Sequence, residues 1–103
     1  MKNAIAQRRL HYLLNGESHP RELIINIYAP YLVAADEVNF AIDEATACCV
    51  VEITGLPESF EEKIYGADPI QALQLAVNID PILKHFSKKY QLFFTSGEPY
   101  FES

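Results

Sequence analysis

The chain has 103 residues, half of them hydrophobic and 21% charged, which excludes a disordered segment and leaves no room for several domains. Its net charge of −6 is uneven: residues 1–35 carry +2, residues 36–68 carry −8, and residues 69–103 are neutral overall. An acidic field repels nucleic acid and anionic lipid and attracts basic proteins. We therefore expect one domain, residues 1–103, that binds neither nucleic acid nor a membrane.

The start of the chain, Met1–Ala4, lacks the apolar segment of a secretory signal, and no apolar stretch approaches the length of about 18 residues that a membrane-spanning helix needs. Cys48 and Cys49 are adjacent, so a disulfide between them would be badly strained. We expect two free thiols, and together these features predict a cytoplasmic protein.

The first half of the chain predicts a hairpin of two antiparallel strands. Alternating apolar residues predict a strand from Ile5 to Leu14, and Asn15-Gly16 predicts the turn after it. The β-branched run from Glu22 to Tyr28 predicts the second strand, which Ala29-Pro30 ends because proline cannot donate to a ladder. Residues 31–44 fit either a helical turn or the beginning of another strand.

The clearest strand pattern runs from Thr46 to Thr54. Its alternation directs Cys49, Val51 and Ile53 toward a core and Cys48, Val50, Glu52 and Thr54 toward the other face. A shorter, charged strand is expected from Phe60 to Tyr65, where the charges are typical of a sheet edge. A last strand is expected from Gln91 to Thr95, followed by a turn at Ser96-Gly97.

The hydrophobic period changes to that of a helix after Gly66. Asp68 is placed to cap the free amides, Pro69 suits the first helical position, and Gln71 completes a capping-box spacing. Two apolar stripes follow: Ile70, Leu73 and Val77 in one, and Leu75, Ile79, Ile82 and Phe86 in the other.

Pro81 should kink or split this helix, because it removes a hydrogen bond and clashes with the carbonyl of Val77. Asp80-Pro81 repeats the cap-plus-proline pattern of Asp68-Pro69. We expect a kink, or a second short helix from Pro81 to Ser87 with Asp80 in the position of the cap. The order of elements predicts an α+β fold: an antiparallel sheet of four or five strands with one helix, kinked or split, packed on one face. The residues expected to be buried together are Leu10, Ile25, Cys49, Val51, Ile53, Leu73 and Val77.

No catalytic, metal or cofactor site is predicted. His11, His19 and His85 show no ligand spacing with one another or with the cysteines, and the four glycines are dispersed as turn residues. Ser18-His19 are neighbours in a turn, an arrangement that rarely forms a nucleophile–base pair. We therefore expect a protein that is not an enzyme and binds no cofactor.

The run from Tyr65 to Ala76 reads Tyr-Gly-x-Asp-x-x-Gln-Ala-Leu-x-Leu-Ala and resembles the signature of a family of small bacterial domains of unknown function. Further counterparts are Arg8-Arg9-Leu10, Asn15-Gly16, the strand through Pro30 and the cysteine-containing strand through Gly55. Pro81 departs from the family pattern, in which the helix is unbroken. The resemblance implies the fold and a bacterial cytosol, and it implies no activity.

Carboxylates crowd the middle third of the chain. We predict that they form a partner-binding surface made of Asp36, Glu37, Asp43, Glu44, Glu58, Glu61 and Glu62. The leading hypothesis is a non-catalytic binding protein of the immunity type, which neutralises a basic toxin by electrostatic capture. The alternative is a self-associating structural or regulatory domain that uses the edge strand at Phe60–Tyr65 or the aromatic tail at Tyr100-Phe101. Solvated acidic loops without a partner also fit the sequence.

Overall fold

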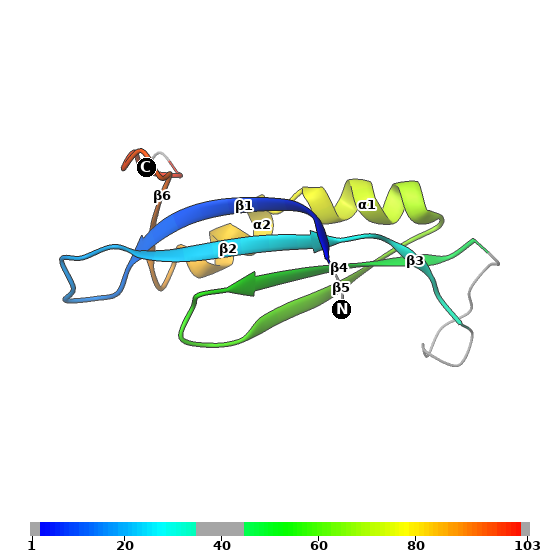
Figure 1. The fold of residues 1–103 in the computed structure, drawn as a ribbon, viewed down its shortest axis with the longest axis horizontal. Helices are drawn as coiled ribbons and strands as arrows, with labels where there is room; N and C mark the ends of the chain where they lie inside the picture. Colours follow the sequence, from blue (N-terminus) through cyan, green and yellow to red (C-terminus); the bar gives the residue numbers. More distant parts are fainter. Residues whose placement is uncertain (1–2, 35–44, 102–103) are drawn as a thin grey trace.

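A computed structural model describes residues 3–34 and 45–101, which form an antiparallel sheet with two helices on one face (Figure 1). The strands are β1 (Ala4–Leu13), β2 (Arg21–Tyr28), β3 (Tyr31–Leu32), β4 (Ala47–Thr54), β5 (Phe60–Gly66) and β6 (Gln91–Phe93), and the helices are α1 (Pro69–Val77) and α2 (Asp80–Phe86). The predicted α+β fold is confirmed. The five predicted strands correspond to β1, β2, β4, β5 and β6, and β3 is an addition.

The sheet runs β6–β1–β2–β4–β5 from one edge to the other, with every neighbouring pair antiparallel. The strand β3 pairs with the same edge of β4 as β2 does, so it continues β2 beyond Ala29-Pro30. Ile27 lies opposite Val51, and Tyr31 lies opposite Cys48. The chain therefore advances four residues from β2 to β3 while it advances three along β4, which leaves one extra residue on the β2–β3 side. The extra residue falls between Ile27 and Tyr31, a stretch that contains Pro30, which has no N–H to donate to the ladder.

The start of α1 follows the predicted capping chemistry. Asp68 Oδ1 accepts a hydrogen bond from the Gln71 backbone N–H at 2.8 Å, and Gln71 Oε1 accepts one from the Ala67 N–H. The second bond reaches one residue farther back than in the usual capping box. Together the two bonds fix the point at which the chain leaves β5 and enters the helix.

The chain breaks between the helices at Asn78-Ile79, so Pro81 splits the predicted helix in two. The expected cap at Asp80 is wrong: Ile79 occupies the N-cap position, and Asp80 is the first helical residue. The Asp80 carboxylate instead accepts a hydrogen bond from Tyr100 Oη at 2.7 Å, which ties the C-terminal turn to α2. Tyr100 Oη also accepts from Arg8 Nη1 at 2.8 Å, so the same hydroxyl joins β1 to α2.

The main core lies between the helices and one face of the sheet. Five residues predicted for it are buried there: Leu10, Ile25, Cys49, Val51 and Ile53. Leu73 is half-buried against this core, whereas the prediction for Val77 is wrong, because its side chain is 52% exposed. The helical residues that enter the core are Ala72, Ala76, Ile79, Leu83 and Phe86, and Ile70 and Leu75 of the predicted stripes are exposed.

The reason for this helix orientation is the close approach of α1 to β5. A methyl group built on Gly66 would overlap the backbone nitrogen and Cα of Ala72, so the backbones of strand and helix lie in direct contact there. A helix this close to the sheet can bury small side chains at its contact face. Ala72 and Ala76 therefore face the sheet, and the larger side chains of α1 are turned to its flanks and outer side.

No helix within residues 3–34 and 45–101 is long and apolar enough to cross a membrane.

The close contact at Gly66 leaves no room for a side chain at this position. Replacing Gly66 with alanine should lower the free energy of unfolding by about 2–3 kcal/mol, because backbone atoms cannot move aside as the end of a flexible side chain can. Gly16→Ala is the control: Gly16 has a positive φ of 83° but nothing within 4 Å of the added methyl, so its cost is backbone strain of about 1 kcal/mol. Urea denaturation compares the two, and an equal or smaller cost at Gly66 would contradict the close contact.

Candidate functional site

The sheet face that points away from α1 and α2 is the strongest candidate for a binding surface, and we call it the open face. Neither helix contributes to the packing on this side. From the strand register, its residues include Gln7, Arg9 and His11 of β1, Glu22, Ile24, Asn26 and Tyr28 of β2, Tyr31 of β3, Cys48, Val50, Glu52 and Thr54 of β4, and Glu61, Lys63 and Tyr65 of β5.

An aromatic cluster occupies one end of the open face. Val33, Cys48 and Val50 are buried there, and the half-buried rings of three tyrosines, Tyr28, Tyr31 and Tyr65, pack against them. The register sets Tyr31 and Tyr65 on either side of Cys48. An open groove of about 510 Å³, lined by Asn3 and the segment from Tyr28 to Tyr31, borders this tyrosine cluster. Tyrosine offers a large apolar ring together with a polar tip, a combination enriched at protein interfaces.

Two carboxylates face each other beside the tyrosine cluster. Glu52 of β4 lies directly opposite Glu61 of β5, on the same face of the sheet. Like charges in this position destabilise a strand pair. Tyr28 Oη donates a 2.6 Å hydrogen bond to Glu52 Oε1, and this bond, aided by partial burial and by the two nearby carboxylate charges, raises the pKa of Tyr28. Glu52 thus has a neutral donor, and no ion pair joins Glu52 or Glu61 to a cation within the described ranges.

The row of polar residues continues across the sheet from this acidic pair. Asn26, buried on β2, lies opposite Glu52, and Gln7 of β1 lies opposite Asn26. Gln7 Nε2 donates to Asn26 Oδ1 at 2.6 Å, which satisfies one acceptor of a buried amide. The open face therefore carries a row of polar side chains across β1, β2, β4 and β5, and this row is negatively charged at its β5 end.

The structure separates the described members of the predicted acidic surface. Glu61 lies on the open face, whereas Glu62, the next residue of β5, points to the side of the helices. Glu58, in the loop between β4 and β5, accepts hydrogen bonds from Lys89 Nζ at 2.8 Å and Tyr90 Oη at 2.6 Å. The remaining four members, Asp36, Glu37, Asp43 and Glu44, lie outside the described residues.

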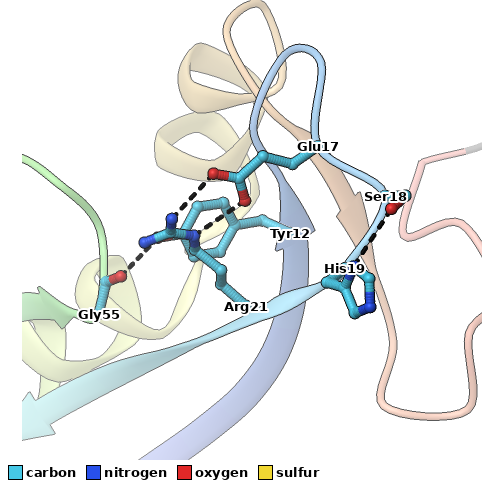
Figure 2. A network of polar contacts seen from close by, with 6 residues as sticks. All are labelled: Tyr12, Glu17, Ser18, His19, Arg21 and Gly55. Carbon is cyan, nitrogen blue, oxygen red and sulfur yellow. Dashed lines mark hydrogen bonds and ion pairs between the residues drawn. The ribbon is translucent and has the colours of Figure 1, made fainter.

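A second polar network pins the loops at the end of the sheet (Figure 2). Arg21 donates to both carboxylate oxygens of Glu17, at 3.1 and 2.8 Å, and Tyr12 Oη donates to the carbonyl oxygen of Gly55 at 2.6 Å. The bond to Arg21 lowers the pKa of Glu17. The Tyr12 ring also meets the ring of Tyr90 edge to face, at 5.3 Å between centroids. Each charge in this network is paired within the chain, so the network holds loops together and has no free charge for a ligand.

Ser18 and His19 come closer than the sequence predicts. Ser18 Oγ and His19 Nδ1 lie 3.2 Å apart, at hydrogen-bonding distance, in the hairpin turn between β1 and β2 (Figure 2). Both residues are exposed, so this single contact lacks the water-excluded surroundings that activate a nucleophile.

The two cysteines are free and buried, as predicted, and they point to opposite faces of β4. Cys49 Sγ donates to the carbonyl oxygen of Tyr28 at 3.1 Å, and burial raises the pKa of the Cys49 thiol. A raised pKa disfavours the reactive thiolate. In the part of the chain that the structure describes, no three His, Cys, Asp or Glu side chains are grouped to hold a metal ion.

The tyrosine cluster and Glu52 were not among the site residues predicted from the sequence. The alternation placed Glu52 on the outer face of its strand, and the same pattern placed Tyr28 on the second face of its own. The missing information was the register between β2, β4 and β5, which sets Glu52 beside Tyr28 and opposite Glu61.

Comparison with known proteins gives one match. The model of one protein family, described as a domain of unknown function (DUF6968), matches residues 6–82, three quarters of the chain. This range contains all of β1 except its first two residues, β2 to α1 and the start of α2, and with them the open face from Gln7 to Tyr65. No curated protein and no solved structure matches the chain.

The pairing of Glu58 predicts a pH dependence of stability. Hydrogen bonds from Lys89 and Tyr90 lower the pKa of Glu58 from its ordinary 4.5 to about 2. A carboxylate with a depressed pKa stabilises the fold at pH values above its unfolded pKa, and this contribution is lost as the pH falls from about 4.5 toward 2. Glu58→Gln should therefore reduce the loss of stability between pH 5 and pH 2.5.

The urea midpoint, measured at several pH values in this range, checks the effect. Glu98→Gln is the matched control, an exposed carboxylate in the C-terminal turn, and it should keep the acid dependence of the unmodified protein. If Glu58→Gln and the unmodified protein lose stability in parallel, the Glu58 contacts do not form in solution.

Proposed function

Because the chain belongs to the family of the domain of unknown function DUF6968, we propose its function from its own surfaces. It is a non-catalytic binding protein of the bacterial cytoplasm that holds a basic protein on the open face, as an immunity protein holds a toxin. The observation that carries this proposal is the pair of carboxylates at Glu52 and Glu61, which face each other and form no ion pair with a cation in the described ranges.

The acidic pair is more favourable with a partner than without one. Two carboxylates directly opposite each other repel, and a lysine or arginine placed between them adds two attractions that offset this repulsion. Glu52 is half-buried and already oriented by Tyr28, so little side-chain freedom is lost when a cation binds it. The pair is therefore suited to a guanidinium or ammonium group that a partner protein presents.

The tyrosine cluster supplies the apolar part of the same surface. Tyr28 belongs to both parts, since its ring covers the buried Cys48 and Val50 and its hydroxyl binds Glu52. Interfaces of high affinity combine rigid aromatic anchors with charged groups around them. The partner that fits this arrangement has an apolar contact region with basic residues at its border.

The long-range field favours the same partner. Residues 36–68 carry a net charge of −8, and such a field speeds the association of a cationic protein. Asp36, Glu37, Asp43 and Glu44 belong to this part of the sequence and contribute to its net charge. Glu58 and Glu62 contribute to the field, although Glu58 is paired with Lys89 and Glu62 lies on the other face of β5.

The test first asks whether a basic toxin domain is encoded beside the gene for this chain. If it is, that domain is the partner used in the experiments, and its absence would count against the immunity proposal. Co-expression with the chain should restore growth, and titration calorimetry of the two purified proteins should show a one-to-one complex. Glu52→Gln/Glu61→Gln should weaken binding about tenfold or more at 50 mM salt, and the difference should narrow at 300 mM, where charges are screened over a shorter distance.

The matched control removes two carboxylates from other places. Glu62→Gln/Glu98→Gln changes the net charge equally but leaves the open face intact, and it should stay within about twofold of the unmodified protein. Equal losses in both double variants would show that net charge alone attracts the partner. Absence of binding and of protection by the unmodified chain would refute the immunity proposal.

A further inference from the structure

The strand β5 forms one edge of the sheet, and three of its residues in succession are exposed. β5 pairs with β4 on one side, and within the described residues no strand pairs with its other side. Glu61, Glu62 and Lys63 at its centre are exposed. An edge of this kind leaves every second N–H and C=O of the strand free to pair with another strand.

The sequence of β5 is complementary to itself when it is read in the opposite direction. In an antiparallel pair of two β5 strands centred on Glu62, Glu61 of each copy lies opposite Lys63 of the other, and Phe60 lies opposite Ile64. This register forms two opposite-charge pairs on the open face and two apolar pairs on the helix face. A shift by two residues in one direction sets Lys63 opposite Lys63, and a shift in the other sets Glu61 opposite Glu61.

We propose that two copies of this chain associate through β5 in the register centred on Glu62. The two sheets then form one continuous antiparallel sheet across a two-fold axis, and the helices of both copies lie on the same side of it. This inference does not depend on the proposed toxin partner, because its evidence is the complementarity of the edge strand with itself. Glu61 is the residue that the dimer contact shares with the acidic pair.

A groove beside Phe60 receives the second copy. Phe60, Glu62, Pro81, Ile82 and His85 line an open groove of about 280 Å³ where α2 meets β5. In the proposed register, Ile64 of the second copy lies opposite Phe60 and therefore at the mouth of this groove. Ile64 is half-buried against the core of its own copy, and the exposed part of its side chain is suited to the rings and aliphatic groups that line the groove.

One unfavourable contact lies at the two-fold axis. Glu62 of each copy faces Glu62 of the other on the helix side, and this repulsion weakens the dimer. A contact through one short strand also buries little area, which is typical of reversible association. We therefore expect a monomer–dimer equilibrium that depends on protein concentration, and Glu62→Gln should shift it toward the dimer.

The decisive experiment exchanges the charges between two variants. Glu61→Lys carries lysine at both positions 61 and 63, and Lys63→Glu carries glutamate at both. In a homodimer of either variant, like charges therefore lie opposite each other. Each should dimerise at least tenfold more weakly than the unmodified chain in sedimentation equilibrium. An equimolar mixture of the two should form a heterodimer, because every charge pair then becomes attractive.

Recovery in the mixture cannot come from refolding of a damaged variant, so this result separates the interface from effects on stability. Lys88→Glu, a charge reversal in the turn that follows α2, is the control and should leave the dissociation constant unchanged. The proposal is overturned if the unmodified chain stays monomeric at 1 mM. It is also overturned if the single variants dimerise as well as the unmodified chain, or if their mixture shows no heterodimer.

Discussion

The contact between Gly66 and Ala72 is the constraint on which the arrangement of the helices depends. It brings the backbone of α1 against the end of β5, and the Asp68 cap fixes the start of the helix three residues before that contact. Because α1 lies so close to the sheet, Ala72 and Ala76 occupy its buried side and the larger residues are turned outward. The break before Pro81 then lets α2 continue over the same face, where Leu83 and Phe86 complete the core.

Because both helices lie on one side of the sheet, neither of them covers the open face on the other side. The open face buries a small cluster under three tyrosines and carries opposed carboxylates at Glu52 and Glu61. The edge strand β5 borders this face, and Glu61 belongs both to the acidic pair and to the proposed dimer contact. Substitutions of Glu52 and Lys63 distinguish the two proposals. Glu52 belongs only to the surface proposed for a basic partner, and Lys63 belongs only to the proposed dimer contact.

The sequence predicted those parts of the fold that local pattern determines. Alternation identified the strands and the two faces of β4, and the Asp68-Pro69 pair identified the start of α1, because each depends on neighbours a few residues away. The exposure of Val77 was not predictable from the helical period, since the orientation of α1 is set by its contact with a distant glycine in β5. Asp80 likewise has the residue type of a cap, yet its partner is Tyr100.

The candidate site depends even more on long-range pairing. Composition indicated an acidic middle third. It could not show that Lys89, 31 residues along the chain, forms an ion pair with Glu58, or that Glu61 and Glu62 point to opposite faces of the sheet. The approach of Tyr28 to Glu52 follows from the ladder between β2 and β4, and a sequence pattern does not give that register.

The central claim is that the open face attracts cationic groups, and amide chemical-shift mapping with a lysine-rich peptide tests it most directly. The account predicts that the shifts concentrate on the open-face residues of β4 and β5 around Glu52 and Glu61, and that they vanish at high salt. Shifts that gather instead on α1, α2 and the C-terminal turn, with the open face unchanged, would contradict it.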